Sequence, residues 1–252
     1  YLSLVLALCL VASVSAFAFA DSKDGDDTPE SKQIIDRYVA ASQARQDVPM
    51  AGSMEVDINA SVPKLKKEGR LRALRQISKI GKITYKVLGF QGDNTVKREV
   101  IARYLEAEQQ AQGNSEKYAL IPQNYKFKYK GIRPSNTGGN VYVFQVAPRK
   151  KAVGLFKGEI WLDTQYYLPL MERGRLVKNP TIFFRKVEFV RDYTIQNGTV
   201  VLQHLESTID TRIVGKVNIS INYSNFVPPP PETPQEPGVP ASQAAMTILS
   251  RN

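Results

Sequence analysis

The sequence predicts an α+β, mostly β fold: an open antiparallel half-barrel of about ten strands with two amphipathic helices as plug or lid. Short segments in which apolar and polar residues alternate recur along the chain, almost without a break from residue 125 to 223. The connections between them are short and turn-like, which is typical of hairpins in a meander. Because alternation leaves one face of the sheet apolar, a flat sheet would aggregate, and we expect it to curl around that face.

The first twenty residues have the composition of a secretory signal peptide. An apolar run from Leu2 to Leu10 leads into small residues, and Ala18-Phe19-Ala20 fits a cleavage motif, so we expect export and cleavage near Ala20. An uncleaved membrane anchor is the alternative. The single cysteine, Cys9, lies inside this segment and has no lipobox around it. The exported chain is then soluble and free of cysteine, which excludes disulfides and thiolate chemistry.

The remaining chain divides into three parts. Residues 21–28 form an acidic flexible lead-in, residues 29–227 form one folded domain, and residues 228–252 begin with four prolines and form a proline-rich disordered tail. The net charge of +10 belongs wholly to the exported chain, because the leader has no charged residue. That charge fits an anionic membrane surface as a partner, and it fits a merely solvated basic face equally well.

Two helices are predicted among the strands. The first begins at Pro29 behind a Thr28 N-cap, and the second carries an apolar face of Val96, Val100, Ile101, Tyr104 and Leu105. The predicted helices span about 29–46 and 95–112, and the predicted strands span about 50–62, 69–78, 82–90, 123–131, 140–149, 153–163, 166–175, 181–193, 199–210 and 212–226.

Residues for catalysis are scarce. His204 is the only histidine, and a triad would have to combine it with Glu206 or Asp210 on the same strand face, although an ordinary surface histidine accounts for it as well. No glycine-rich phosphate loop follows a strand. We therefore expect no enzyme, no cofactor and no metal site. Four carboxylates fit cross-strand partners of Lys and Arg better than a catalytic pair: Glu159, Asp163, Glu172 and Glu188.

Aromatic and basic residues alternate from Tyr125 to Lys130. Strict alternation places the rings on one face of the sheet and the lysines on the other. A surface that binds single-stranded nucleic acid needs both on the same face. We expect no nucleic-acid partner.

The chain resembles the bacterial outer-membrane lipoprotein carrier and sorting proteins, which have the LolA/LolB-like fold. The resemblance covers about Glu30 to Phe226 and rests on the order of the elements, with Ile160-Trp161-Leu162-Asp163 and Leu168-Pro169 as its most specific residues. It implies a lipid-binding half-barrel that acts as a periplasmic chaperone in outer-membrane biogenesis and transport. Its inner- and outer-membrane transfer partners would load and unload the acyl chains of lipoproteins, or a similar lipid.

The resemblance and the apolar alternation together predict which side chains face the lipid. They lie on the sheet and on the inner faces of both helices: Ile35, Tyr38, Val56, Ile58, Ile83, Tyr85, Val100, Tyr104, Tyr125, Phe127, Tyr129, Tyr142, Phe144, Val217, Ile219 and Ile221.

The chain also departs from the family pattern. It has no lipobox, it has a proline-rich tail, and Arg70, Arg72 and Arg75 all compete as counterpart of the arginine that joins strand and lid in the carrier. Related folds sense mislocalised lipid or regulate envelope stress. An envelope lipid-sensing scaffold that docks a protein partner through its tail is therefore the alternative function.

Overall fold

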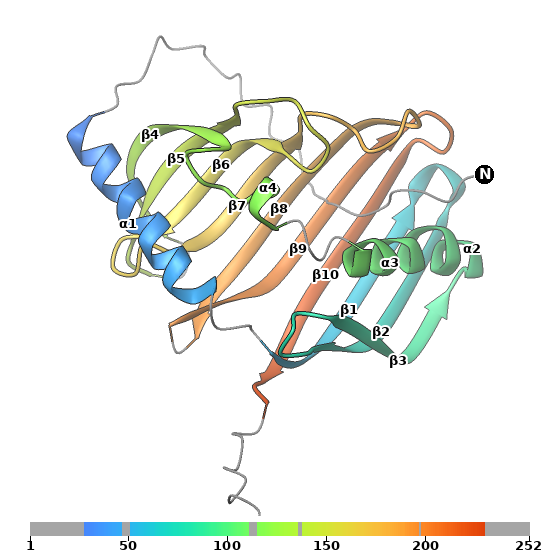
Figure 1. Ribbon diagram of the computed structural model, residues 1–252. Helices are drawn as coiled ribbons and strands as arrows, with labels where there is room; N and C mark the ends of the chain where they lie inside the picture. Colours follow the sequence, from blue (N-terminus) through green and yellow to red (C-terminus); the bar gives the residue numbers. More distant parts are fainter. Residues whose placement is uncertain (1–27, 47–50, 111–114, 136–137, 197, 230–252) are drawn as a thin grey trace, which may run out of the picture.

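A computed structural model describes residues 28–46, 51–110, 115–135, 138–196 and 198–229. In these ranges ten strands form one antiparallel sheet that does not close, and helices lie across its concave face (Figure 1). The predicted open half-barrel is confirmed. The elements are α1 (Pro29–Gln46), β1 (Gly52–Val62), η1 (Pro63–Leu65), β2 (Lys67–Ile77), β3 (Ile83–Gly92), α2 (Asn94–Val96), η2 (Lys97–Ala102), α3 (Arg103–Gln110), α4 (Ser115–Tyr118), β4 (Tyr125–Pro134), β5 (Asn140–Pro148), β6 (Phe156–Asp163), β7 (Pro169–Leu176), β8 (Phe184–Gln196), β9 (Thr199–Thr211) and β10 (Lys216–Val227).

The sheet consists of two meanders joined edge to edge. Its strand order is β3-β2-β1-β10-β9-β8-β7-β6-β5-β4, so each strand from β4 to β10 pairs with its neighbour in sequence, as the hairpin signals predict. The first three strands join through β1, which pairs antiparallel with β10 and sets Ile58 opposite Ile221. The β1–β10 pairing therefore places the first and the last strand of the chain side by side within the sheet.

One row of paired residues crosses the concave face through all ten strands. We call it the floor row, and eight of its ten members are apolar or aromatic. The other two form an ion pair at the centre of the row, where alternation alone would place apolar residues. From β3 to β4 the floor row reads Phe90, Leu71, Ile58, Ile221, Leu205, Arg191, Glu172, Ile160, Phe144 and Tyr129.

The first helix lies over the β4 side of the sheet (Figure 1). Thr28 caps it, since the Ser31 backbone N–H donates to Thr28 Oγ1 at 3.2 Å, as predicted. Ile34 and Tyr38 are buried on its inner face, and Ile35 is half-buried beside them. Within the described ranges, no helix combines the length and the apolar character needed to cross a bilayer.

The second predicted helix is one continuous helical stretch made of α2, η2 and α3, with a π-helical segment in its middle. It lies over β1–β3 (Figure 1), and all five apolar residues predicted for its inner face are buried. Asp93 caps its start by accepting the Thr95 backbone N–H at 2.7 Å. The predicted stop after Gln112 lies outside the described residues, as do the expected leader and most of the tail.

Several strand boundaries differ from the prediction by about three residues, and two of these differences have a clear local cause or consequence. Ile213 was expected in the last strand, but it lies in the β9–β10 connection and is 61% exposed. The strand expected from Tyr166 starts at Pro169, because Asp163 Oδ1 accepts the backbone N–H groups of Gln165 and Tyr166 and so lengthens the turn.

Candidate functional site

The concave face under α3 is closed by a polar contact that we call the latch: Arg75 on β2, Tyr85 on β3 and Glu108 on α3. Arg75 Nη2 lies 2.6 Å from Glu108 Oε1, and the Tyr85 hydroxyl donates to Glu108 Oε2. The side chains of Arg75 and Glu108 are only 11% and 22% exposed. The latch therefore ties the last turns of α3 to the sheet through charges that are largely removed from water.

The pKa values of Arg75 and Tyr85 are both raised in the latch. Burial by itself would lower the pKa of Arg75, but the facing Glu108 carboxylate outweighs it and raises that pKa above its usual range. Burial, reinforced by Glu108, raises the pKa of Tyr85 above its ordinary value. Both groups therefore keep their charge states throughout the physiological pH range.

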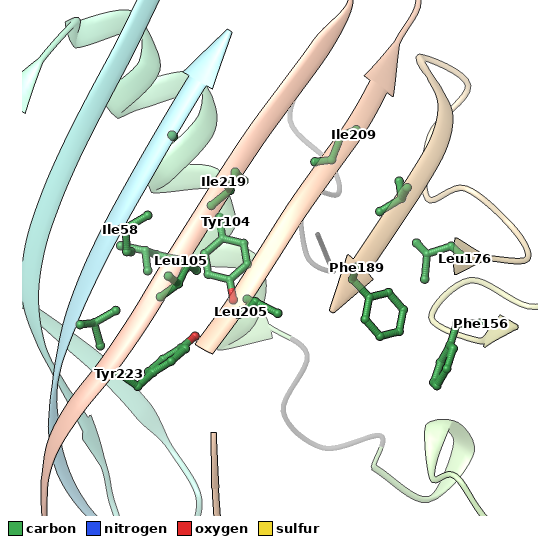
Figure 2. Close-up of a cluster of buried hydrophobic side chains, with 14 of the residues drawn as sticks. Ile58, Tyr104, Leu105, Phe156, Leu176, Phe189, Leu205, Ile209, Ile219 and Tyr223 are labelled. Carbon is green, nitrogen blue, oxygen red and sulfur yellow. The ribbon is translucent and has the colours of Figure 1, made fainter. Parts of the chain in front are cut away.

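Two buried tyrosines continue the latch toward the centre of the sheet. The hydroxyls of Tyr104 on α3 and Tyr223 on β10 are hydrogen-bonded, and the Arg75 guanidinium lies 5.9 Å from the Tyr223 ring centroid. Figure 2 shows the two phenol oxygens turned toward each other beside Leu105 and Leu205. Burial raises the pKa of both tyrosines. The inner face of α3 thus carries apolar and polar contacts together.

A pocket of about 220 Å³ lies beside the latch, where β1, β8, β9 and β10 come together. Met54 joins the two features, because its sulfur lies 3.8 Å from Arg75 Nη1 and it also lines the pocket. Tyr223 also lines the pocket, and its ring lies beside the Arg75 guanidinium. The pocket is lined by Met54, Thr194, Gln196, Val201, Leu202, Gln203, Tyr223, Ser224, Asn225 and Phe226.

The ion pair in the floor row is the second polar feature of the concave face. Arg191 Nη1 lies 3.1 Å from Glu172 Oε2, and the Tyr193 hydroxyl donates to the same oxygen at 3.1 Å. The guanidinium also lies 4.8 Å from the Phe189 ring centroid. These contacts satisfy charges that would otherwise be costly on an apolar surface. Burial and the Glu172 charge together raise the pKa of Tyr193.

The β4 side of the concave face is aromatic. Under α1, Tyr38 packs on Phe127 with ring centroids 6.4 Å apart, and Tyr129 lies 5.1 Å from Phe144. Arg37 donates to the Tyr167 hydroxyl at 2.7 Å and so ties the other side of α1 to the β6–β7 turn. Since Phe127 and Tyr129 are only half-buried, this wall keeps apolar surface that α1 does not cover.

The sixteen residues predicted to face the lipid lie on the sheet and the two helices, and eleven of them are either fully buried or part of the floor row. None of the sixteen lines the pocket. Tyr85 belongs to the latch, and Ile35 and Ile83 are half-buried. Their contact with a lipid stays a prediction. The eleven are Tyr38, Val56, Ile58, Val100, Tyr104, Tyr125, Tyr129, Phe144, Val217, Ile219 and Ile221. Phe127 and Tyr142 are half-buried on the aromatic β4 side of the face.

Of Arg70, Arg72 and Arg75, it is Arg75 that pairs with a helix, through Glu108 on α3. Arg70 and Arg72 point to the other face of β2, where Arg70 pairs with Asp57. Arg75 instead lies on the same face of β2 as the buried residues Leu71 and Ala73. An arginine on the apolar face of a strand was the signal that could have identified it.

The other chemical candidates are accounted for by local contacts. His204 Nδ1 lies 2.7 Å from Asn222 Oδ1 and Nε2 lies 3.4 Å from Glu206 Oε1, so both ring nitrogens face oxygen atoms of neighbouring side chains. Glu159 pairs with Arg173 at 2.7 Å, as a cross-strand partner should. In the part of the chain that the structure describes, no three His, Cys, Asp or Glu residues gather in a way that could hold a metal ion.

No family model and no curated protein matches the chain. Among solved structures, it is similar to a DUF1329 family protein from Desulfovibrio piger (12% identity, 82% of this chain and 96% of that one, TM-score 0.44). It is also similar to a LolA superfamily protein from Nitrosomonas europaea (10% identity, 81% and 94%, TM-score 0.37) and to Pseudomonas aeruginosa MucB in its complex with MucA (10% identity, 79% and 94%, TM-score 0.27). At such identities and TM-scores the likeness does not bear on what this chain binds.

Proposed function

We propose that the chain is a periplasmic carrier that binds the acyl chains of lipoproteins, or a similar lipid, non-covalently on the concave face beneath its helices. The latch is the observation that carries this proposal. A helix that only completed a core would need apolar contacts alone, whereas α3 is also tied down by a charge pair beside a pocket. The charge pair itself can open and re-form, because both charges can be hydrated when they part.

The size of the pocket sets how the cargo enters. A volume of about 220 Å³ is below the roughly 300–1,000 Å³ of ordinary small-molecule sites. The closed form therefore accepts only part of an acyl chain, and the rest requires α3 to move away from the sheet. Burial of roughly 15 methylenes is worth about 12 kcal/mol, which is enough to offset the loss of the contacts that hold α3.

Native mass spectrometry of the protein purified from cells tests the proposal. The expected result is a co-purifying lipid that a fluorescent fatty acid displaces. A protein that carries no lipid and does not bind the fatty-acid probe would contradict a carrier function. The transfer step is tested separately, by incubating loaded protein with outer-membrane vesicles and following the lipid.

A further inference from the structure

Four connections lie together at one end of the sheet: residues 63–66, 149–155, 177–183 and 212–215. We call this set the loop rim. The Arg212 backbone N–H and Nε donate to the carbonyls of Phe183 and Ile182, and the Val177 N–H donates to the Leu155 carbonyl at 3.0 Å. A Cβ on Gly215 would lie 3.5 Å from Lys64. The loop rim is therefore one continuous surface, and three of its connections are visible at the upper right of Figure 1.

Large apolar side chains project from this surface. Ile182 is 80% exposed and Ile213 is 61% exposed, and both stand at the tips of neighbouring connections. Leu65, Phe183 and Val153 are exposed on the same rim. Single exposed apolar residues are ordinary, but several on adjoining loops mark a surface that meets an apolar partner.

The charges around these side chains all have one sign. The loop rim contains seven Lys or Arg residues and no Asp or Glu. The closest acidic residues along the chain, Glu68 and Asp210, lie just outside the loops. Asp93, at the same end, is paired with Lys67 at 3.0 Å. The seven cations are Lys64, Lys66, Arg149, Lys150, Lys151, Lys178 and Arg212.

We propose that the loop rim docks the protein on the surface of an anionic lipid bilayer. Exposed apolar side chains such as Ile182 and Ile213 can enter the boundary between headgroups and acyl chains, while the surrounding lysines and arginines contact the lipid phosphates. An acidic protein would complement the charge of the loop rim, but binding to it would not require exposed apolar side chains on several separate loops. The inference goes beyond the proposed function, because it holds whether or not the concave face carries a lipid.

Flotation of the exported protein with vesicles tests the proposal, its N-terminus first checked by mass spectrometry so that an uncleaved leader cannot cause binding. Vesicles of phosphatidylglycerol with phosphatidylethanolamine should bind the protein at low salt, and phosphatidylcholine vesicles should not. Binding should weaken strongly at roughly 1 M salt, where the Debye length is about 3 Å. Absence of binding to the anionic vesicles at low salt overturns the proposal, even if an acidic protein binds the rim.

Two double variants separate the contributions. Lys64→Gln with Lys178→Gln should weaken anionic-vesicle binding about 25-fold, or about fivefold for each cation. Ile182→Ser with Ile213→Ser should weaken it at least about tenfold. All four side chains are exposed, so the unfolding midpoint should not change.

The chain offers a matched control at the opposite end of the sheet. Ile80 is 88% exposed in the β2–β3 turn between Lys79 and Lys82. Ile80→Ser with Lys79→Gln and Lys82→Gln should leave vesicle binding unchanged, and an equal loss in this variant would overturn the proposal. Displacement of a fatty-acid probe should be the same in all variants, which separates this inference from the carrier function.

Discussion

Arg75 and Glu108 form an ion pair of 2.6 Å that joins the concave face of β2 to helix α3. The same strand carries a second arginine pair on its other face, where Arg70 contacts Asp57 with its side chain 55% exposed. The two pairs share a strand and a chemistry and differ in solvent exposure. That difference makes them a natural comparison for the role of the latch.

Glu108→Gln should loosen α3. It leaves Arg75 without its counter-charge in a largely buried position, which costs about 3 kcal/mol, the low end for a buried pair. If the loss is local, the population with α3 lifted rises on the order of a hundredfold, and a fatty-acid probe should bind faster. Stopped-flow fluorescence with hydrogen exchange of α3 measures both effects.

Arg70→Gln is the control for the latch, because it breaks the exposed pair on the opposite face. It should leave the rate of probe binding and the exchange of α3 unchanged. If both variants speed binding equally, a general loss of stability accounts for the effect and α3 is not a lid.

The lowered pKa of Asp93 should make the stability of the fold depend on pH in the acidic range. The Lys67 ammonium, with the backbone N–H groups of Thr95 and Val96, lowers the pKa of Asp93 to about 2 from its ordinary 3.8. A lowered folded-state pKa gives stability that is present above the unfolded value and is lost as pH falls through the folded one. Asp93→Asn should therefore be less stable than the parent at pH 6, and the two should converge as pH falls from about 4 to about 2. Urea unfolding at several pH values measures this; a constant difference would contradict it.

Local patterns predicted most of the fold. Alternation placed each of the ten strands, and turn residues paired the seven strands from β4 to β10, because hairpins join neighbours in sequence. The pairing of β1 with β10 could not be predicted in the same way. Ile58 and Ile221 each alternate with polar neighbours, but nothing in either strand says that the other is its partner. Such a contact depends on the path of the chain between β3 and β4.

The candidate site was less accessible to sequence reasoning. The sequence shows Arg75 on the apolar face of a predicted strand. Its partner Glu108 could not be singled out, because it lies among other Glu and Gln residues in α3. Leu202 and Gln203, which line the pocket, lie where the register of β8 and β9 shifts between Asp192 and Tyr193, so that Tyr193 is opposite Leu202. Such an extra residue in one strand cannot be recognised from the alternation of apolar and polar residues before the pairing of the strands is known.

The raised pKa values of the buried tyrosines should make the folded chain lose stability at alkaline pH. Their pKa values are raised chiefly by burial, so the folded chain keeps them neutral where the unfolded chain ionises. Stability is then complete below pH 10 and falls as pH rises further. Absorbance at alkaline pH should show one set of tyrosines ionising reversibly and a second set ionising only together with the loss of circular dichroism. The second set should be Tyr38, Tyr85, Tyr104, Tyr193 and Tyr223; ionisation of all tyrosines before unfolding would contradict the burial.

Removal of the tail distinguishes a carrier from a docking scaffold. The pocket wall ends at Phe226 and β10 ends at Val227, so a chain that stops after Pro229 keeps every described contact of the site. Its affinity for a fatty-acid probe should stay within about twofold of the full chain. A chain that stops after Asn225 is the matched control, because it removes Phe226 from the pocket and the pairing of Val227 with Ser53. It should bind the probe more weakly. If the longer truncation product binds lipid normally but loses a protein that the full chain captures, the tail is a docking segment and the sensing scaffold becomes the better account.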